Sequence, residues 1–174
     1  MLQPTRGNCS CWYDKFLGGD PMAVIQKSTI DIKMTGDVIS HSRTDIAVRD
    51  LTVVLDEPIA RGGTNLGASP TETLIVALTG CLSVISHKIA ATLEIELKDM
   101  TIDVVSKFDR RGVMLENRVA VPFPQMDVTI NVSTSADDEK IRLLKRNLAT
   151  YCPISTMIRQ SGTELNENWN ITKI

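Results

Sequence analysis

The chain has 174 residues, of which 43% are hydrophobic and 23% charged, an ordinary composition for a globular protein with a single core. Lysine and arginine number 19 against 21 acidic residues, so the net charge of −2 offers no broad basic field to nucleic acid or to an anionic membrane. No stretch reaches the ~20 uninterrupted apolar residues of a membrane span and residues 1–20 lack the apolar core of a signal peptide, so we expect a cytoplasmic protein without nucleic-acid or membrane partners.

Residues 1–23 differ from the rest of the chain, because glycines and prolines interrupt every hydrophobic period there. We predict an N-terminal arm at this end and one domain over residues 24–174. The arm contains Cys9 and Cys11 as a Cys-Ser-Cys pair. A zinc site needs about four ligands and the chain has two histidines, so we expect ordinary reduced thiols here rather than a metal site.

Two stretches that follow the arm alternate apolar and polar side chains, as half-buried strands do. Their apolar positions are Ile30, Ile32 and Met34 in the first, and Leu51, Val53 and Leu55 in the second. The polar residues 41–50 between them favour antiparallel pairing of the two strands. A loop over residues 56–68, marked by one proline and three glycines, then leads into a helix.

The longest helix is predicted from Pro70 to Leu93. Ser69 is a suitable N-cap, Pro70 suits the first helical position, and Glu72 completes a capping box three residues after the cap. The helix is apolar nearly all round, so we expect it to be buried on most sides. Such a helix in a chain of this size is suited to the core of a dimer.

The alternation of apolar and polar residues returns after this helix. Strands are predicted from Met100 to Val104, from Val113 to Val121 and, most clearly, from Met126 to Val132. Ser135, with Asp138 three residues later, can cap the helix that follows.

The C-terminal part of the chain is expected to hold a short helix and a last strand. The helix runs from Pro153 to near Gly162, and the strand contains Trp169 and Ile171. Strands, a long helix, strands and then helices make an α+β protein rather than a repeating βαβ chain.

Two cysteines of the predicted domain suggest thiol redox chemistry. Cys81 lies inside the long apolar helix, where a lone cysteine is most often a small hydrophobic side chain. Cys152 directly precedes a proline that can open a helix, a cap position where unpaired backbone N–H groups favour a thiolate. In a reducing cytosol, a bond between these two cysteines would be transient and catalytic.

Three segments of the chain resemble the OsmC/Ohr family of osmotically inducible and organic-hydroperoxide-resistance proteins. They are Gly62-Gly63-Thr64-Asn65-Leu66-Gly67-Ala68-Ser69-Pro70-Thr71-Glu72-Thr73-Leu74, the helix that carries Cys81, and Cys152-Pro153-Ile154-Ser155. The resemblance extends over residues 24–174. It implies an OsmC-like fold, with antiparallel sheets packed on a long buried central helix, in an intertwined homodimer.

The function that the resemblance implies is a thiol-dependent peroxidase for organic hydroperoxides and hydrogen peroxide, in defence against oxidative stress. In this scheme Cys81 becomes a sulfenic acid and Cys152 resolves it as a disulfide. A dithiol or a lipoyl-bearing protein then reduces the disulfide, and no metal or organic cofactor is required.

The family's peroxidases also use an arginine from a strand near the N-terminus and a glutamate directly after an Asn-Pro pair. This chain has Ser69-Pro70 in place of that pair, so Thr71 falls at the glutamate position and Glu72 a quarter turn further round the helix. We expect Glu72 to be a helix cap. Arg43 is the better candidate for the arginine and Arg49 the next, although a solvated arginine is the commoner outcome in such polar surroundings.

The missing glutamate is typical of less characterised OsmC-like branches, so peroxidase activity is expected to be weak. His87 lies about 120° around the helix from Cys81 and is expected to be a surface or interface histidine rather than a base.

A second hypothesis is a non-enzymatic protein that binds a small apolar ligand in a cleft at the dimer interface. Sulfurs within disulfide reach, in a cleft open to solvent, favour the redox hypothesis, whereas a sealed Cys81 favours ligand binding.

Overall fold

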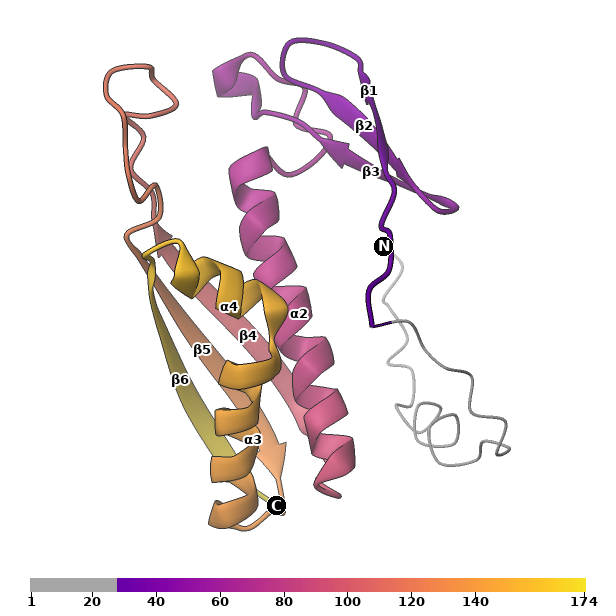
Figure 1. The fold of residues 1–174 in the computed structure, drawn as a ribbon, viewed down its shortest axis with the longest axis vertical. Coiled ribbons are helices and arrows are strands. Elements are labelled where there is room, and N and C mark those ends of the chain that lie inside the picture. The colour runs from indigo at the N-terminus through magenta and orange to yellow at the C-terminus, as the bar shows by residue number, and fades with distance from the viewer. Residues whose placement is uncertain (1–27) are drawn as a thin grey trace. The chain divides into compact units, whose positions relative to one another are not determined.

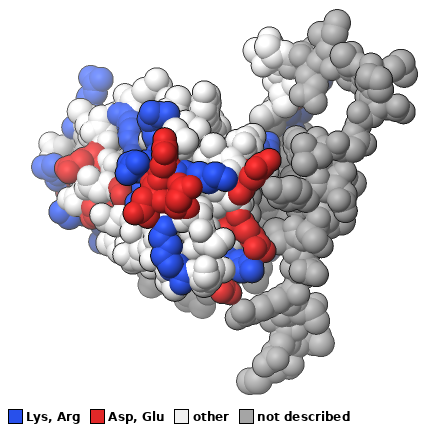
Figure 2. Space-filling view, turned by 90° about the horizontal axis from the view of Figure 1, so that it is seen from below, with Lys and Arg blue, Asp and Glu red and all other residues white. Residues whose placement is uncertain are grey.

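The computed structural model describes residues 28–174. Its helices and strands all belong to one compact unit, Met34–Ile174. Two three-stranded sheets and a long helix between them in the chain confirm the predicted α+β class (Figure 1). Figure 2 shows basic and acidic side chains interspersed on the face viewed there, in keeping with the small net charge.

The first sheet is an antiparallel meander. It consists of β1 (Thr35–Val38), β2 (Thr44–Val48) and β3 (Leu51–Leu55), paired in that order. The strand predicted over 51–55 is confirmed. The strand expected from Ile30 begins only at Thr35, and the residues meant for its buried side are exposed because no element of the described chain covers them. The short strand β2 was not predicted. It lies between β1 and β3, so the expectation that the two predicted strands pair with each other is wrong, and each pairs with β2 instead.

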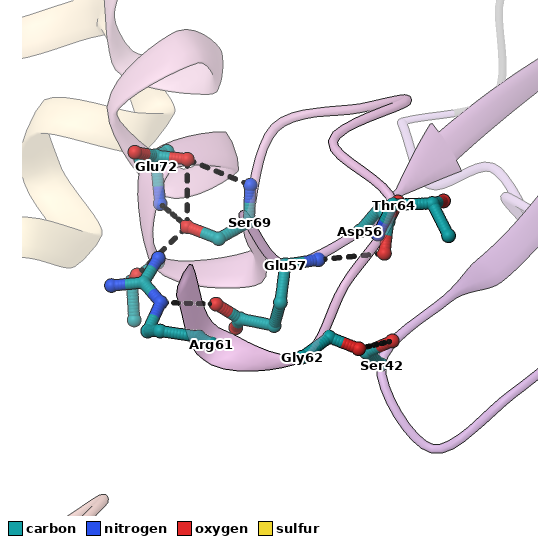
Figure 3. A network of polar contacts seen from close by, with 9 residues as sticks. Ser42, Asp56, Glu57, Arg61, Gly62, Thr64, Ser69 and Glu72 are labelled. Atoms are coloured by element: carbon teal, nitrogen blue, oxygen red, sulfur yellow. Dashed lines mark hydrogen bonds and ion pairs between the residues drawn. The ribbon is translucent and has the colours of Figure 1, made fainter. Parts of the chain in front are cut away.

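The loop between β3 and the long helix is organised around the carboxylate of Asp56, which is fully buried. This carboxylate accepts backbone N–H groups from Glu57 at 2.8 Å and Thr64 at 3.0 Å, and the Thr64 hydroxyl at 2.5 Å (Figure 3). It also accepts the backbone N–H of Leu66 at 3.1 Å. These donors hold the pKa of Asp56 below its ordinary value, the Thr64 hydroxyl having the largest effect. The loop is therefore folded around one buried charge.

Two glycines let this loop close on itself. A Cβ on Gly63 would lie 1.7 Å from the carbonyl oxygen of Glu57, and one on Gly67 would lie 2.0 Å from that of Val54. Only glycine permits backbone to approach backbone so closely. The closure ends where the N–H of Asp56 donates to the carbonyl of Ala68 at 3.2 Å, directly before the helix.

The long helix α2 (Pro70–Thr92) agrees with the prediction in its limits but not in its burial. Five of its 23 residues are buried, and they form one stripe: Leu78, Leu82, Ser86, Ile89 and Ala90. On other sides Val76 and Val84 are exposed. The expectation of a helix buried on most sides is therefore wrong for the single chain, because the chain's own elements cover only one face.

By length and composition α2 is also the one helix among residues 28–174 that could cross a membrane. The expectation of no membrane span rested on the polar residues that interrupt its apolar run. The core helix of a globular protein meets the same criterion, and α2 packs against α3, α4 and β4. The expected absence of a membrane partner stays a prediction, as does the cytoplasmic location.

The second sheet contains β4 (Lys98–Lys107), β5 (Gln125–Thr134) and β6 (Glu164–Lys173) in that order. β4 and β5 are antiparallel, whereas β5 and β6 are parallel. The expectation of antiparallel sheets throughout is therefore wrong for the last pair. Two helices connect β5 to β6 and return the chain to the same end of the sheet, as a parallel pair requires.

These two helices are α3 (Asp138–Tyr151) and α4 (Pro153–Gln160). Asp137, rather than the predicted Ser135, caps α3, because its side chain accepts the N–H of Lys140 at 2.8 Å. The buried side of β5 joins the helices in one hydrophobic core, to which Leu78, Leu82, Met126, Val128, Ile130, Leu144 and Leu148 belong.

The strand predicted from Val113 to Val121 is absent, and residues 108–122 form turns. Local hydrogen bonds replace strand pairing, from the N–H of Met114 to the carbonyl of Arg110 and from Glu116 to Arg111. Leu115 takes a φ of 58°, which ends any extended run. Among the described residues the segment has no neighbouring strand with which its backbone pairs, so the alternation of its apolar side chains did not produce a strand.

We predict that Asp56→Asn lowers the melting temperature at neutral pH by about 3 °C or more, because an amide has one acceptor oxygen in place of two. Since the folded pKa is lowered from 3.8, the carboxylate's contribution is fully present above that pH and is lost as pH falls through the folded pKa. The difference between variant and wild type should therefore shrink below about pH 3.8 in thermal denaturation followed by circular dichroism. Asp50→Asn, in the exposed β2–β3 turn, is the control, and equal effects of the two substitutions would contradict the assignment.

Candidate functional site

The structure brings together the two cysteines singled out in the sequence. Cys81 lies in the middle of α2, and Cys152 lies between α3 and α4, where it is the C-cap of one helix and the N-cap of the other. The thiol of Cys152 donates to Sγ of Cys81, with 3.3 Å between the sulfurs. Both are free thiols. A disulfide of ~2.05 Å needs a further approach of roughly 1.3 Å, within reach of small side-chain adjustments.

The two cysteines differ in their exposure to solvent. Cys81 is partly exposed, whereas Cys152 is fully buried in the core. A reagent from solvent therefore meets Cys81 first. This difference supports the predicted order of action, in which Cys81 reacts with the oxidant and Cys152 reacts with Cys81. One condition of the sequence-based test is met, since Cys81 is not sealed from solvent.

Opposing influences act on the thiol of Cys81. Burial is the largest and raises its pKa, because a thiolate loses favourable hydration. The backbone N–H of Ile154, in the first turn of α4, lowers the pKa by hydrogen bonding. The Cys152 thiol raises it again, because two adjacent thiols do not readily ionise together. The net effect is a raised pKa, so the opening of α4 only partly offsets burial.

A positive side chain acts on Cys81 from the same helix. The charge of Lys88 lowers the pKa of Cys81. Seven residues correspond to nearly two full turns, so Lys88 lies on the same side of α2 as Cys81, ~10.5 Å along the axis. Helical side chains lean towards the N-terminus, and hence that of Lys88 leans towards Cys81. Sequence reasoning missed Lys88, although the seven-residue spacing was available as a signal.

Arg43, the arginine predicted to support Cys81, is engaged elsewhere in the single chain. Its guanidinium forms two hydrogen bonds to the carboxylate of Asp45, both at 2.7 Å. This pair raises the pKa of Arg43 and lowers that of Asp45. The alternative, Arg49, lies in the β2–β3 turn with a φ of 54°. Of the described cations, Lys88 rather than Arg43 lowers the pKa of Cys81, and a catalytic role for Arg43 stays a prediction.

Glu72 is a helix cap, as predicted. Its carboxylate accepts the N–H and the hydroxyl of Ser69, both at 2.8 Å, and its own N–H donates to the Ser69 hydroxyl oxygen at 3.4 Å (Figure 3). These hydrogen bonds, together with the nearby charge of Arg61, lower the pKa of Glu72. Arg61 in turn donates to Glu57 at 2.6 Å. An arginine that the sequence did not single out thus stands beside the start of α2.

His87 interacts with its own helix rather than with the cysteines. A ring nitrogen, Nδ1, lies 2.8 Å from the carbonyl oxygen of Ser83, one turn earlier. This agrees with the expectation that His87 is not the base for Cys81. The pair Cys9 and Cys11 lies outside the described residues.

The family model for OsmC-like proteins matches residues 63–168, which include both Cys81 and Cys152 and the second half of the loop before α2. The chain belongs to the OsmC-like protein family. This confirms the resemblance seen in the sequence. No curated protein was found to match.

Solved structures show the same fold at low sequence identity. The OsmC-like protein of Mycoplasma pneumoniae superposes with a TM-score of 0.69 at 14% identity, over 82% of this chain and 98% of that one. The organic hydroperoxide resistance protein OsmC of Legionella pneumophila gives 0.56 at 14% identity, over 84% and 99%. OhrB of Bacillus subtilis, an organic hydroperoxide resistance protein, gives 0.51 at 19% identity, over 82% and 98%. At these identities the likeness establishes the fold.

We predict that Lys88→Met raises the pKa of Cys81 and slows its alkylation at neutral pH. A unit charge about 10 Å away in water is worth roughly a twofold change in rate at low ionic strength. The measurement is the pH dependence of iodoacetamide modification in a Cys152→Ser background. Lys88→Arg should keep the wild-type rate, and the difference should fade in high salt.

Lys98→Met, on β4, removes an equal charge that does not shift Cys81 and serves as the control. Equal slowing by Lys88→Met and Lys98→Met would show a general effect of net charge and would contradict a specific role for Lys88.

Proposed function

We propose that this protein is a two-cysteine thiol peroxidase that reduces organic hydroperoxides, and hydrogen peroxide, in defence against oxidative stress. The observation that supports it best is the 3.3 Å between the sulfurs of Cys81, a partly exposed residue, and Cys152, a buried one, in a member of the OsmC-like family. The structures of two organic hydroperoxide resistance proteins with the same fold add support.

The first step is attack by the thiolate of Cys81 on one oxygen of the peroxide. The O–O bond breaks, Cys81 is oxidised to a sulfenic acid, and the other oxygen leaves as an alkoxide that takes up a proton to become an alcohol. The N–H of Ile154 and the charge of Lys88 favour the thiolate that begins this step, whereas burial opposes it. The raised pKa of Cys81 that results is consistent with modest peroxidase activity.

The second step is attack by Cys152 on the sulfenic sulfur of Cys81. An S–S bond forms, the S–O bond breaks, and hydroxide leaves as water after protonation. Because Cys152 is already 3.3 Å away and shielded from solvent, it is placed to react with Cys81 before a second peroxide does. Two further electrons must come from an external dithiol, such as a lipoyl-bearing protein, by thiol–disulfide exchange.

A homodimer is part of this proposal. The face of α2 opposite its buried stripe carries exposed apolar side chains, including Val76 and Val84. A second copy of the chain would cover this face, and it would make α2 the buried central helix that the family resemblance implies. Apolar surroundings of this kind would suit an alkyl hydroperoxide better than hydrogen peroxide.

We predict that Cys81→Ser abolishes peroxide consumption, because a serine hydroxyl cannot cycle through a sulfenic acid. Cys152→Ser should allow one oxidation per chain and then stall, leaving a sulfenic acid that dimedone traps. Stopped-flow oxidation by cumene hydroperoxide and by hydrogen peroxide, with mass spectrometry of the products, measures both outcomes. Unchanged turnover in Cys81→Ser would refute the proposal. The absence of both the dimedone adduct and a wild-type disulfide would remove Cys152 from it and favour a non-enzymatic role.

We predict a mass near 38.4 kDa in solution, twice the 19.2 kDa of one chain, by light scattering at micromolar concentration. Val84→Glu should convert the dimer to monomer without unfolding it, because Val84 is 50% exposed in the single chain. Val105→Glu is the control, since this valine is 70% exposed on the side of β4 opposite Ile102 and Val104, which pack against the core. A monomeric wild type would exclude the dimer.

A further inference from the structure

A concave site lies at the N-terminal end of α2, apart from the cysteines. It is a cavity of about 440 Å³ between the first turns of α2 and residues 106–123, which include the end of β4 and the turns that follow. This volume is within the range of small-molecule pockets, roughly 300–1,000 Å³. Neither Cys81 nor Cys152 lines it. Ile75, the last residue of α2 that lines the cavity, is six residues and therefore ~9 Å along the axis from Cys81.

The wall of this cavity is mostly apolar. Ile75 contributes from α2, and Val113 and Met114 contribute from the turns. Phe108 and Phe123 line it as a stacked pair with ring centroids 4.9 Å apart. Two stacked rings form a rigid apolar surface, which suits a hydrocarbon chain or a ring.

Most polar groups of the lining are already satisfied. Ser69 and Glu72 bind each other in the capping box, so the N-terminus of α2 is not free to hold an anion (Figure 3). Glu57 and Arg61 form an ion pair at 2.6 Å. The polar groups of these four residues are paired with one another, so none of them needs a ligand as a partner.

Arg110 is the exception in this lining. Among residues 28–174 its exposed guanidinium has no hydrogen bond or ion pair. The adjacent Arg111 is held by both carboxylate oxygens of Asp109, at 3.0 and 2.6 Å, and this contact lowers the pKa of Asp109 to about 2. Asp109 is thus committed to Arg111. A free arginine at an apolar, aromatic-walled cavity has the donor geometry for a carboxylate.

The charges of the lining select the type of anion. Two carboxylates, Glu57 and Glu72, balance the two arginines, Arg61 and Arg110. The cavity therefore has no net positive charge with which to hold a dianion such as a phosphate monoester. A single carboxylate can pair with Arg110 while its apolar part lies against the two phenylalanines.

We propose that this cavity binds a monocarboxylate with an apolar body, such as a medium-chain carboxylic acid, through an ion pair with Arg110. The site is independent of the proposed peroxidase chemistry, since no step of that chemistry uses its residues.

The test is isothermal titration calorimetry of the full chain with octanoate and with its uncharged analogue octanamide. Octanoate should bind saturably and more tightly than octanamide, and more weakly as salt is added. Arg110→Gln should weaken octanoate binding about tenfold or more, and Arg110→Lys less, because lysine keeps the charge but not the planar fork. Arg118→Gln, which removes an exposed arginine of the same segment that does not line the cavity, is the matched control and should bind octanoate as the wild type does.

Several results would overturn this proposal. They are no saturable binding up to about 10 mM octanoate, equal affinity for octanamide, or equal weakening by Arg110→Gln and Arg118→Gln. Octanoate binding should also persist in Cys81→Ser, which cannot act as a peroxidase. Loss of binding in that variant would place the ligand at the cysteines and exclude the cavity. Retained binding would show that the cavity binds octanoate whether or not the protein is a peroxidase.

Discussion

The packing of one stripe of α2 against α3, α4 and the inner face of the second sheet is the constraint on which the site depends. Leu78 and Leu82, on either side of Cys81 in the chain, are fully buried in that core, as is Leu148 of α3. With these side chains in place, the break between α3 and α4 falls opposite Cys81. A large-to-small substitution in this core would lower the stability of the protein and also separate the two sulfurs, because close-packed interiors transmit displacement.

The same burial works against the chemistry that it makes possible. It holds a resolving thiol out of solvent and within 3.3 Å of Cys81, and it also raises the pKa of Cys81. The opening of α4 and the charge of Lys88 oppose that rise without reversing it. One packing arrangement thus brings the resolving thiol close to Cys81 and at the same time disfavours the Cys81 thiolate. Arg43, bound to Asp45 in the single chain, adds nothing to this balance unless an assembly of two chains brings it to Cys81.

The loop before α2 shows a separate use of a buried charge. Asp56 is stabilised by hydrogen bonds rather than by an ion pair, and its four donors fold residues 56–68 into a fixed shape. That shape delivers Ser69 to its cap position and places the ion pair of Arg61 and Glu57 beside it. The polar groups at the start of α2 are consequently satisfied before any ligand arrives. Arg110, from a distant part of the chain, is the lining cation left available.

The sequence by itself determined the features that depend on neighbours along the chain. The limits of α2, its capping box, the alternation of β5 and the helix break at Cys152-Pro153 are local, since propensity, capping and hydrophobic period act over a few residues. The family, too, could be identified from local motifs. Expectations failed where a local pattern lacked a spatial partner, as in the absent strand over 113–121 and the exposed side chains of Ile30 and Ile32.

Only the tertiary structure decided which distant groups meet. The 3.3 Å between Cys81 and Cys152, 71 positions apart, follows from the packing of three helices. The parallel direction of β6 depends on where the crossover helices return the chain, and the burial of Asp56 depends on donors eight and ten residues away. Such contacts are set by the shape of the whole core, which no window of sequence contains, because each forms only after the loop that separates its partners has closed.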